Sequence, residues 1–194
     1  YIKSFALGIA VASRGADHLR NRPTLDILRL PDGVRMKIFG VETSADPTSY
    51  EGKAGMVAWH DDIYAVTDCL GVCKFIMHGF NSPHLLGYDH FVELVKSVEG
   101  IDFTETELRE VGRRVIDLER QINLEFGRTR SDDTLPKRYF DDPMPGRVTK
   151  GHHIDRAKFQ VMLDEYYAAR GWSAVEGHLP IGRLEELNHL TSNE

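Results

Sequence analysis

The stretch that decides the fold is EGKAGMVAWHDDIYAVTDCLGVC, residues 51–73. Its apolar residues recur at helical spacing: Met56, Trp59, Ile63, Tyr64 and Val66. This periodicity predicts a helix over residues 51–67. The helix runs into DCLGVC, residues 68–73, which places a carboxylate, a glycine and two thiols close together. The stretch therefore predicts an amphipathic helix whose end carries chemically reactive groups.

Helical patterns also flank this stretch on both sides. They predict helices at residues 2–12, 87–98, 104–126, 155–171 and 181–190. The helix at 104–126 begins most clearly, because Thr104 and Glu107 can form a capping box. Its apolar stripe is Leu108, Val111, Val115, Leu118, Ile122 and Phe126. Few alternating patterns suggest strands, so we expect a mostly α fold, an irregular helical domain.

Two segments are expected to be irregular. Residues 25–39 are interrupted by Pro31-Asp32-Gly33, a turn signal. Residues 128–153 contain several prolines and glycines and are predicted to form a long connector. Within that connector, residues 128–136 place two arginines shortly before two aspartates. We expect a salt-bridged loop there that fixes the packing of helices.

Composition narrows the class of protein. The chain has 194 residues, of which 41% are hydrophobic and 28% charged, as in ordinary globular domains. Its net charge of -6 argues against nucleic acid as a partner. No run approaches the roughly 18 apolar residues that favour membrane insertion. The two cysteines suit a reducing cytoplasm, and an apolar start without methionine predicts a fragment.

The two cysteines leave several interpretations open. Cys73 is a candidate metal ligand, and Asp68 could accept hydrogen bonds from the N–H edge of a pterin or guanine. Two thiolates, however, cannot complete a four-thiolate iron–sulfur cluster. Residue types alone favour a buried helix with inert cysteines and Asp68 as a cap. A zinc site of Cys69 and Cys73 with His60 and His78 matches no zinc-finger spacing.

Three histidines lie in polar segments. His18 follows RGAD, residues 14–17, between apolar stretches. A histidine there can serve as acid, base or hydrogen-bond donor near neutral pH, although a satisfied structural histidine is the commoner case. His152 and His153 lie in a glycine-containing loop, where solvated side chains are expected.

Taken together, these segments resemble the C-terminal part of the tungsten-dependent aldehyde ferredoxin oxidoreductase family. The motifs that carry the resemblance are SRGADHL (13–19), DCLGVC (68–73), LERQIN (118–123), DDTLPKR (132–138), YY (166–167), RGW (170–172), EG (176–177) and LEEL (184–187). Their order is that of the family. The resemblance implies one C-terminal helical domain over residues 1–194. It further implies a pterin- and cluster-binding segment at about 10–80 and a helical tail at about 85–194.

The resemblance also implies cofactors. These are a tungstopterin, with tungsten (or molybdenum) held by two pyranopterins, and a [4Fe–4S] cluster. Residues 68–73 resemble the second of two Asp-x-x-Gly-Leu-Cys/Asp patterns in the family, with Val72 in place of leucine. The cofactor-binding residues carried over are Asp68, Leu70, Gly71, Val72 and Cys73. Cys73 would be the metal ligand completing the cluster, and His18 the catalytic histidine near the metal.

The implied function is oxidation of an aldehyde to a carboxylic acid, with electrons passing through the cluster to ferredoxin. The family's N-terminal domain, first three cluster cysteines, first pterin motif and metal-proximal glutamate have no counterpart here. The chain is therefore expected to need the missing N-terminal part or a partner subunit, and a homodimer is left open. Alternatives are a non-catalytic helical interaction domain and the tungsten subunit of a benzoyl-CoA reductase complex.

Overall fold

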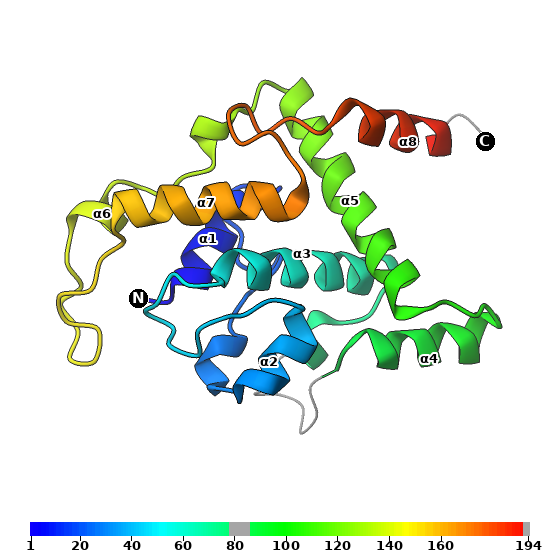
Figure 1. The fold of residues 1–194 in the computed structure, drawn as a ribbon, viewed down its shortest axis with the longest axis horizontal. Helices are drawn as coiled ribbons and strands as arrows, with labels where there is room; N and C mark the ends of the chain where they lie inside the picture. Colours follow the sequence, from blue (N-terminus) through cyan, green and yellow to red (C-terminus); the bar gives the residue numbers. More distant parts are fainter. Residues whose placement is uncertain (78–85, 192–194) are drawn as a thin grey trace.

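The computed structural model describes residues 1–77 and 86–191, and within these ranges all regular structure is helical (Figure 1). The α-helices are α1 (Lys3–Val11), α2 (Asp32–Phe39), α3 (Lys53–Cys69), α4 (Tyr88–Glu99), α5 (Glu105–Glu125), α6 (Arg138–Asp141), α7 (Arg156–Arg170) and α8 (Ile181–Thr191). The 3-10 helices are η1 (Leu25–Leu28), η2 (Lys74–Met77) and η3 (Arg130–Asp132). The predicted mostly α fold is confirmed. No helix in the described ranges is long and apolar enough to span a membrane.

Helix α3 is the central element of the fold. It contacts α1, α2, α5 and α7; Figure 1 shows α7 above α3, α2 below it, and α5 crossing it obliquely. Nearly all its residues from Lys53 to Thr67 are buried. A helix enclosed on all sides belongs in the core of a domain. The stretch 51–73 therefore supplies the helix around which the others pack.

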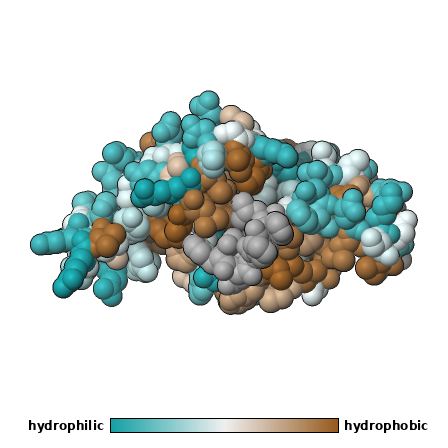
Figure 2. Space-filling model, turned by 90° about the horizontal axis from the view of Figure 1, so that it is seen from below, coloured by the Kyte–Doolittle hydropathy of each residue, from teal (hydrophilic) through white to brown (hydrophobic). Residues whose placement is uncertain are grey.

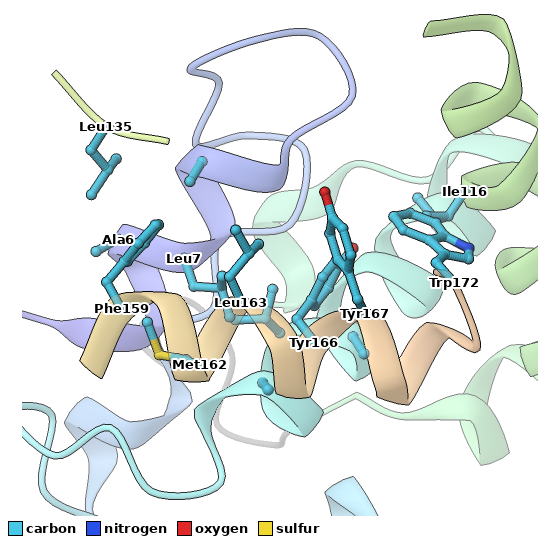
Figure 3. Packing of buried hydrophobic residues seen from close by; sticks show 14 of the residues in the cluster. Ala6, Leu7, Ile116, Leu135, Phe159, Met162, Leu163, Tyr166, Tyr167 and Trp172 are labelled. Atoms are coloured by element: carbon cyan, nitrogen blue, oxygen red, sulfur yellow. The ribbon is translucent and has the colours of Figure 1, made fainter. Parts of the chain in front are cut away.

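The apolar core has two parts, one on each side of α3. The first lies between α1, α3 and α7, where Leu163 of α7 lies beside Leu7 of α1 (Figure 3). The second lies between α3 and the helices α2, α4 and α5, and includes Trp59 and Phe91. Aromatic rings contribute to both parts of the core, and each ring buries a large apolar area.

A buried polar network joins α3 to α7. Arg170 pairs with Asp61 at 2.9 Å and with Asp62, and it also donates to the Ala58 carbonyl at 3.0 Å. The Tyr166 hydroxyl donates to Asp61 at 2.6 Å. Burial raises the pKa of the Asp62 carboxyl, and the nearby Arg170 charge opposes that shift. The network fixes the position of α7 on α3, because unpaired charges at this depth would be costly.

The prediction for residues 25–39 is wrong, because they contain η1 and α2. Pro31 is the N-cap residue of α2 rather than part of a turn. Proline suits a helix start, where its missing N–H has no intrahelical partner to lose. Arg35 pairs with Asp32 at 2.7 Å, and Phe39 packs into the core. A proline–glycine signal thus marked a helix start.

The apolar stripe of α5 is only partly in the core. Leu108 is buried, but Ile122 is 51% exposed and Phe126 is 88% exposed. Helix α5 crosses α3 at an angle, so its C-terminal half extends beyond the other helices (Figure 1). The prediction of a helix with a capping box is confirmed, since Thr104 and Glu107 form both reciprocal hydrogen bonds.

The connector of residues 128–153 holds helices in place, as expected. Arg128 donates to the backbone carbonyls of Ala10 and Ala12, at 3.1 and 2.9 Å. Asp133 forms ion pairs with both Arg128 and Arg120, at 2.6 and 2.8 Å. These bonds tie the connector to α5 and to the chain after α1.

We expect Arg170→Gln to lower the free energy of unfolding by about 3–5 kcal/mol, because it leaves the buried Asp61 without a cation and leaves Asp62 with Arg109 alone, 3.5 Å away. Urea denaturation followed by circular dichroism would measure the change. Arg156→Gln is the matched control, because Arg156 pairs with Asp141 on the surface. Its expected loss is below about 1 kcal/mol. Equal losses in the two variants would contradict a structural role for the network.

The capping box of α5 gives a prediction about pH. Hydrogen bonds from the backbone amide and hydroxyl of Thr104 hold the pKa of Glu107 below its ordinary value. The hydrogen-bonded carboxylate therefore stabilises the fold at pH values above the ordinary glutamate pKa. This stabilisation is lost as the pH falls through the lowered pKa of Glu107. The difference in melting temperature between wild type and Glu107→Gln should therefore shrink on acidification. In a Thr104→Ala background the backbone amide still donates to Glu107 but the hydroxyl is gone, so the effect of Glu107→Gln should be smaller and keep the same pH dependence.

Candidate functional site

The DCLGVC segment forms the C-terminal cap of α3. The Val72 amide donates to the Thr67 carbonyl at 2.9 Å, and the Gly71 amide donates to the Asp68 carbonyl at 3.2 Å. Gly71 has a φ of 66°. These two bonds and the left-handed residue define a Schellman motif. The glycine of the pattern is explained by this backbone requirement.

The cap separates apolar from reactive side chains. Leu70 and Val72 are partly buried and pack against the core below α3. Asp68, Cys69 and Cys73 are exposed, and the cysteines form no disulfide. The expectation of buried, inert cysteines is therefore wrong for this helix end. A branched apolar residue at position 72 suffices for the packing, which accounts for valine where the family pattern has leucine.

Asp68 is bound through one oxygen only. Its Oδ2 accepts a hydrogen bond from Lys74 Nζ at 2.6 Å and another from Arg20 Nη1. No described residue donates to Oδ1, and the side chain is 44% exposed. One carboxylate oxygen therefore stays open as an acceptor toward solvent.

Arg20 links this carboxylate to α5. Its side chain is only 5% exposed. Its Nε donates to Glu119 Oε2 at 3.1 Å, and Nη2 donates to the other oxygen of Glu119. Sequence reasoning missed Arg20, Glu119 and Lys74 as members of the site. A signal existed, because Arg20 directly follows the motif of residues 13–19 and Glu119 lies within LERQIN (118–123).

The structure places the loop that carries His18 beside this cap. The carbonyl of Leu19 accepts from Lys74 Nζ at 3.4 Å. Within the loop, the Leu19 amide donates to Asp17 Oδ1 at 2.7 Å. His18 itself is exposed, and its ring lies 6.1 Å from that of Phe5, centroid to centroid. Residues 18 and 68–73 thus belong to one region of the surface.

The other predicted metal ligands are not brought together. His60 is buried within α3, and its Nδ1 lies 2.8 Å from the Met56 carbonyl. His78 lies outside the described residues. His152 stacks edge-on against Tyr1, away from the α3 cap. In the described part of the chain, no three His, Cys, Asp or Glu side chains are grouped to hold a metal ion.

A cavity of about 450 Å³ lies below α3 and was missed by sequence reasoning. Its walls include the aromatic side chains Trp59, His60, Tyr64 and Tyr88. Burial raises the pKa of the Tyr64 and Tyr88 phenols, so both stay neutral near pH 7. This lower side of the molecule carries broad apolar areas (Figure 2). The cavity was missed because its walls come from elements that only the fold brings together.

The exposed groups at the α3 cap fit a pterin and one corner of a cluster. Asp68 Oδ1 is an open acceptor for an amino-substituted heterocycle. A Cβ placed on Gly71 would meet nothing within 4 Å, so the turn is open on its outer side. Cys73 offers one exposed thiol, whereas a [4Fe–4S] cluster takes four thiolates. The cap can therefore supply part of such a site.

Comparison with known proteins identifies the family to which the chain belongs. The sequence profile described as "Aldehyde ferredoxin oxidoreductase, domains 2 & 3" matches residues 1–188. The chain belongs to the aldehyde ferredoxin oxidoreductase family and corresponds to its C-terminal part.

Individual relatives agree with this assignment. The tungsten-containing aldehyde ferredoxin oxidoreductase of Pyrococcus furiosus is 33% identical over 183 residues. Those of Pyrococcus horikoshii and Thermococcus kodakarensis are 32% and 31% identical. Each alignment covers 93% of this chain and 27% of the relative. The chain thus spans about a quarter of the length of the curated relatives it matches.

We expect Gly71→Ala to destabilise the chain by about 1–2 kcal/mol, because alanine at a positive φ is strained. Space is not the cause, since the added methyl group is unobstructed. Gly33→Ala is the control, because Gly33 lies inside α2 without a positive φ and has the same open surroundings. Alanine should be neutral or stabilising there. Similar losses at both positions in urea denaturation would count against the strained cap.

Proposed function

We propose that this chain forms one wall of the cofactor site of a tungstopterin oxidoreductase that oxidises an aldehyde to a carboxylic acid. The observation that carries the proposal is the α3 cap. It exposes Asp68 Oδ1 and the Cys73 thiol on one turn, in a chain of a family whose relatives contain tungsten. Asp68 would hold the N–H edge of one pterin, and Cys73 would be one ligand of a [4Fe–4S] cluster.

Each residue of the cap then has a physical task. Gly71 gives the chain its left-handed turn, and Leu70 and Val72 anchor the turn to the core. Asp68 orients the heterocycle through its open oxygen. Cys73 would hold the cluster through its exposed thiol and, next to a bound pterin, would lie on the electron path. We assign these tasks to about residues 10–80, of which 78–80 lie outside the described residues, and a supporting role to the helical tail.

His18 is proposed to act on the substrate. As a neutral or protonated imidazole on an exposed loop, it can donate a hydrogen bond to the aldehyde oxygen or carry a proton away. When bound, the tungstopterin and the cluster supply the two-electron oxidation and its one-electron outlet. The contribution of this chain is to bind, orient and exchange protons.

The proposal includes partners. Cys73 supplies one thiolate, so the remaining cluster ligands and the second pterin contact must come from another part of the enzyme. Ferredoxin is the proposed electron acceptor, the cytoplasm the proposed compartment, and a homodimer is left open. Alone, the chain is expected to be inactive.

The test uses this chain in complex with the missing N-terminal part of the enzyme or the partner subunit that supplies it. Cys73→Ala should lower the iron content and remove the cluster signal in electron paramagnetic resonance, because one ligand is lost. Cys69→Ala is the matched control, since Cys69 is equally exposed and four residues away. It should leave iron and spectrum unchanged. An unaltered spectrum in Cys73→Ala would overturn the ligand assignment.

Two further experiments test the role of Asp68 and the proposed activity. Asp68→Asn should reduce tungsten retention, because the amide nitrogen cannot accept from the pterin edge. Asp102→Asn, which alters a surface pair with Lys96, should retain the metal. A wild-type complex without tungsten or iron would defeat the proposal. Aldehyde-dependent dye reduction would separate it from a non-catalytic interaction domain and from an aromatic-ring reductase.

A further inference from the structure

We propose that Arg20 is a positioning residue that fixes the carboxylate of Asp68, with Glu119 as its anchor on α5. The inference rests on the proposed function, in which Asp68 holds a pterin. Three separate segments meet at this point: the loop after α1, the end of α3 and the middle of α5. Arg20 is the side chain that contacts both acidic partners.

The geometry gives Arg20 two tasks that use different nitrogens. Nε and Nη2 face the two oxygens of Glu119, which is the fork arrangement that fixes the plane of a guanidinium. Nη1 remains for Asp68 Oδ2. Because Glu119 sets the plane, the third nitrogen has a defined direction, and the carboxylate that binds it is oriented in turn.

Burial makes this arrangement rigid. The Arg20 side chain is 5% exposed, whereas Glu119 and Asp68 are 29% and 44% exposed. The cation is therefore held inside the protein, and the carboxylates reach it from the surface. Lys74 also contacts Asp68 Oδ2, but through a single ammonium on a flexible stem. Lys74 adds charge, while Arg20 supplies direction.

The consequence concerns the open oxygen of Asp68. With Oδ2 occupied by both cations, Oδ1 points away from them and is the atom left for a ligand. Without Arg20, the Asp68 side chain would exchange between χ1 rotamers and would no longer hold Oδ1 in one direction. A partner with two adjacent N–H groups, such as a pterin edge, would then meet a disordered acceptor and bind more weakly.

The first arm of the test needs no pterin. In the purified chain, three-bond NMR couplings of the Asp68 β-protons should report one χ1 rotamer. They should report averaged rotamers in Arg20→Gln, and also in Arg20→Lys, because an ammonium cannot reproduce the fork. Glu119→Gln should cause partial averaging. Unchanged couplings in Arg20→Gln would overturn the inference.

Arg120→Gln is the matched control. Arg120 is as buried as Arg20, at 4% side-chain exposure, and pairs with Asp133 in the core rather than with Asp68. It should lower stability without altering the Asp68 couplings. If Arg120→Gln averaged them as well, the effect of Arg20 would be general loosening, and the positioning role would fail.

The second arm adds pterin itself as the probe, followed by its fluorescence. Arg20→Gln should raise the dissociation constant about tenfold, as Asp68→Asn should, while Arg120→Gln leaves it unchanged. A wild-type chain that binds no pterin, but whose Asp68 rotamer depends on Arg20, would refute the pterin assignment and uphold the positioning role. Averaged rotamers with unchanged pterin affinity would refute the positioning role for ligand binding.

Discussion

The contact of Arg170 with Asp61 and Asp62 is the constraint on which the other packing depends. Asp61 and Asp62 are adjacent buried carboxylates on the central helix; Arg109 lies 3.5 Å from Asp62, but the buried cation that both carboxylates share is Arg170. That cation comes from the last turn of α7, so α7 can dock on α3 in one register. The same carboxylate, Asp61, also accepts from Asn21 at 2.7 Å, which places the loop after α1. The core network thus positions the chain that leads to His18 and Arg20.

Much of this fold could be predicted from sequence, because its long helices have strong local signals. The capping box at Thr104 and the periodicity of residues 51–67 each specify an element without tertiary information. Residues 25–39 could not be predicted in this way. Pro31 and Gly33 are compatible with a turn or with a helix start, and only the burial of Phe39 decides between them.

The candidate site shows a similar division. The motif of residues 68–73 is local, so its cap could be anticipated from one glycine after a helical run. Arg20 and Glu119 are 99 positions apart, and no periodicity relates them. The exposure of Cys69 and Cys73 is likewise a property of packing that local sequence does not specify. Sequence patterns therefore pointed to the glycine turn of the candidate site but not to the residues that support it.

Glu119 and Arg120 are consecutive residues of α5 that form ion pairs with different parts of the chain. One holds Arg20 at the surface site, and the other holds Asp133 in the connector at 2.8 Å. Successive residues of a helix are about 100° apart around its axis. A rotation of α5 cannot loosen one ion pair without moving the other. Glu119 and Arg120 consequently anchor the loop of Arg20 and the connector of residues 128–153 to adjacent positions of one helix, so that a shift of α5 would reach both.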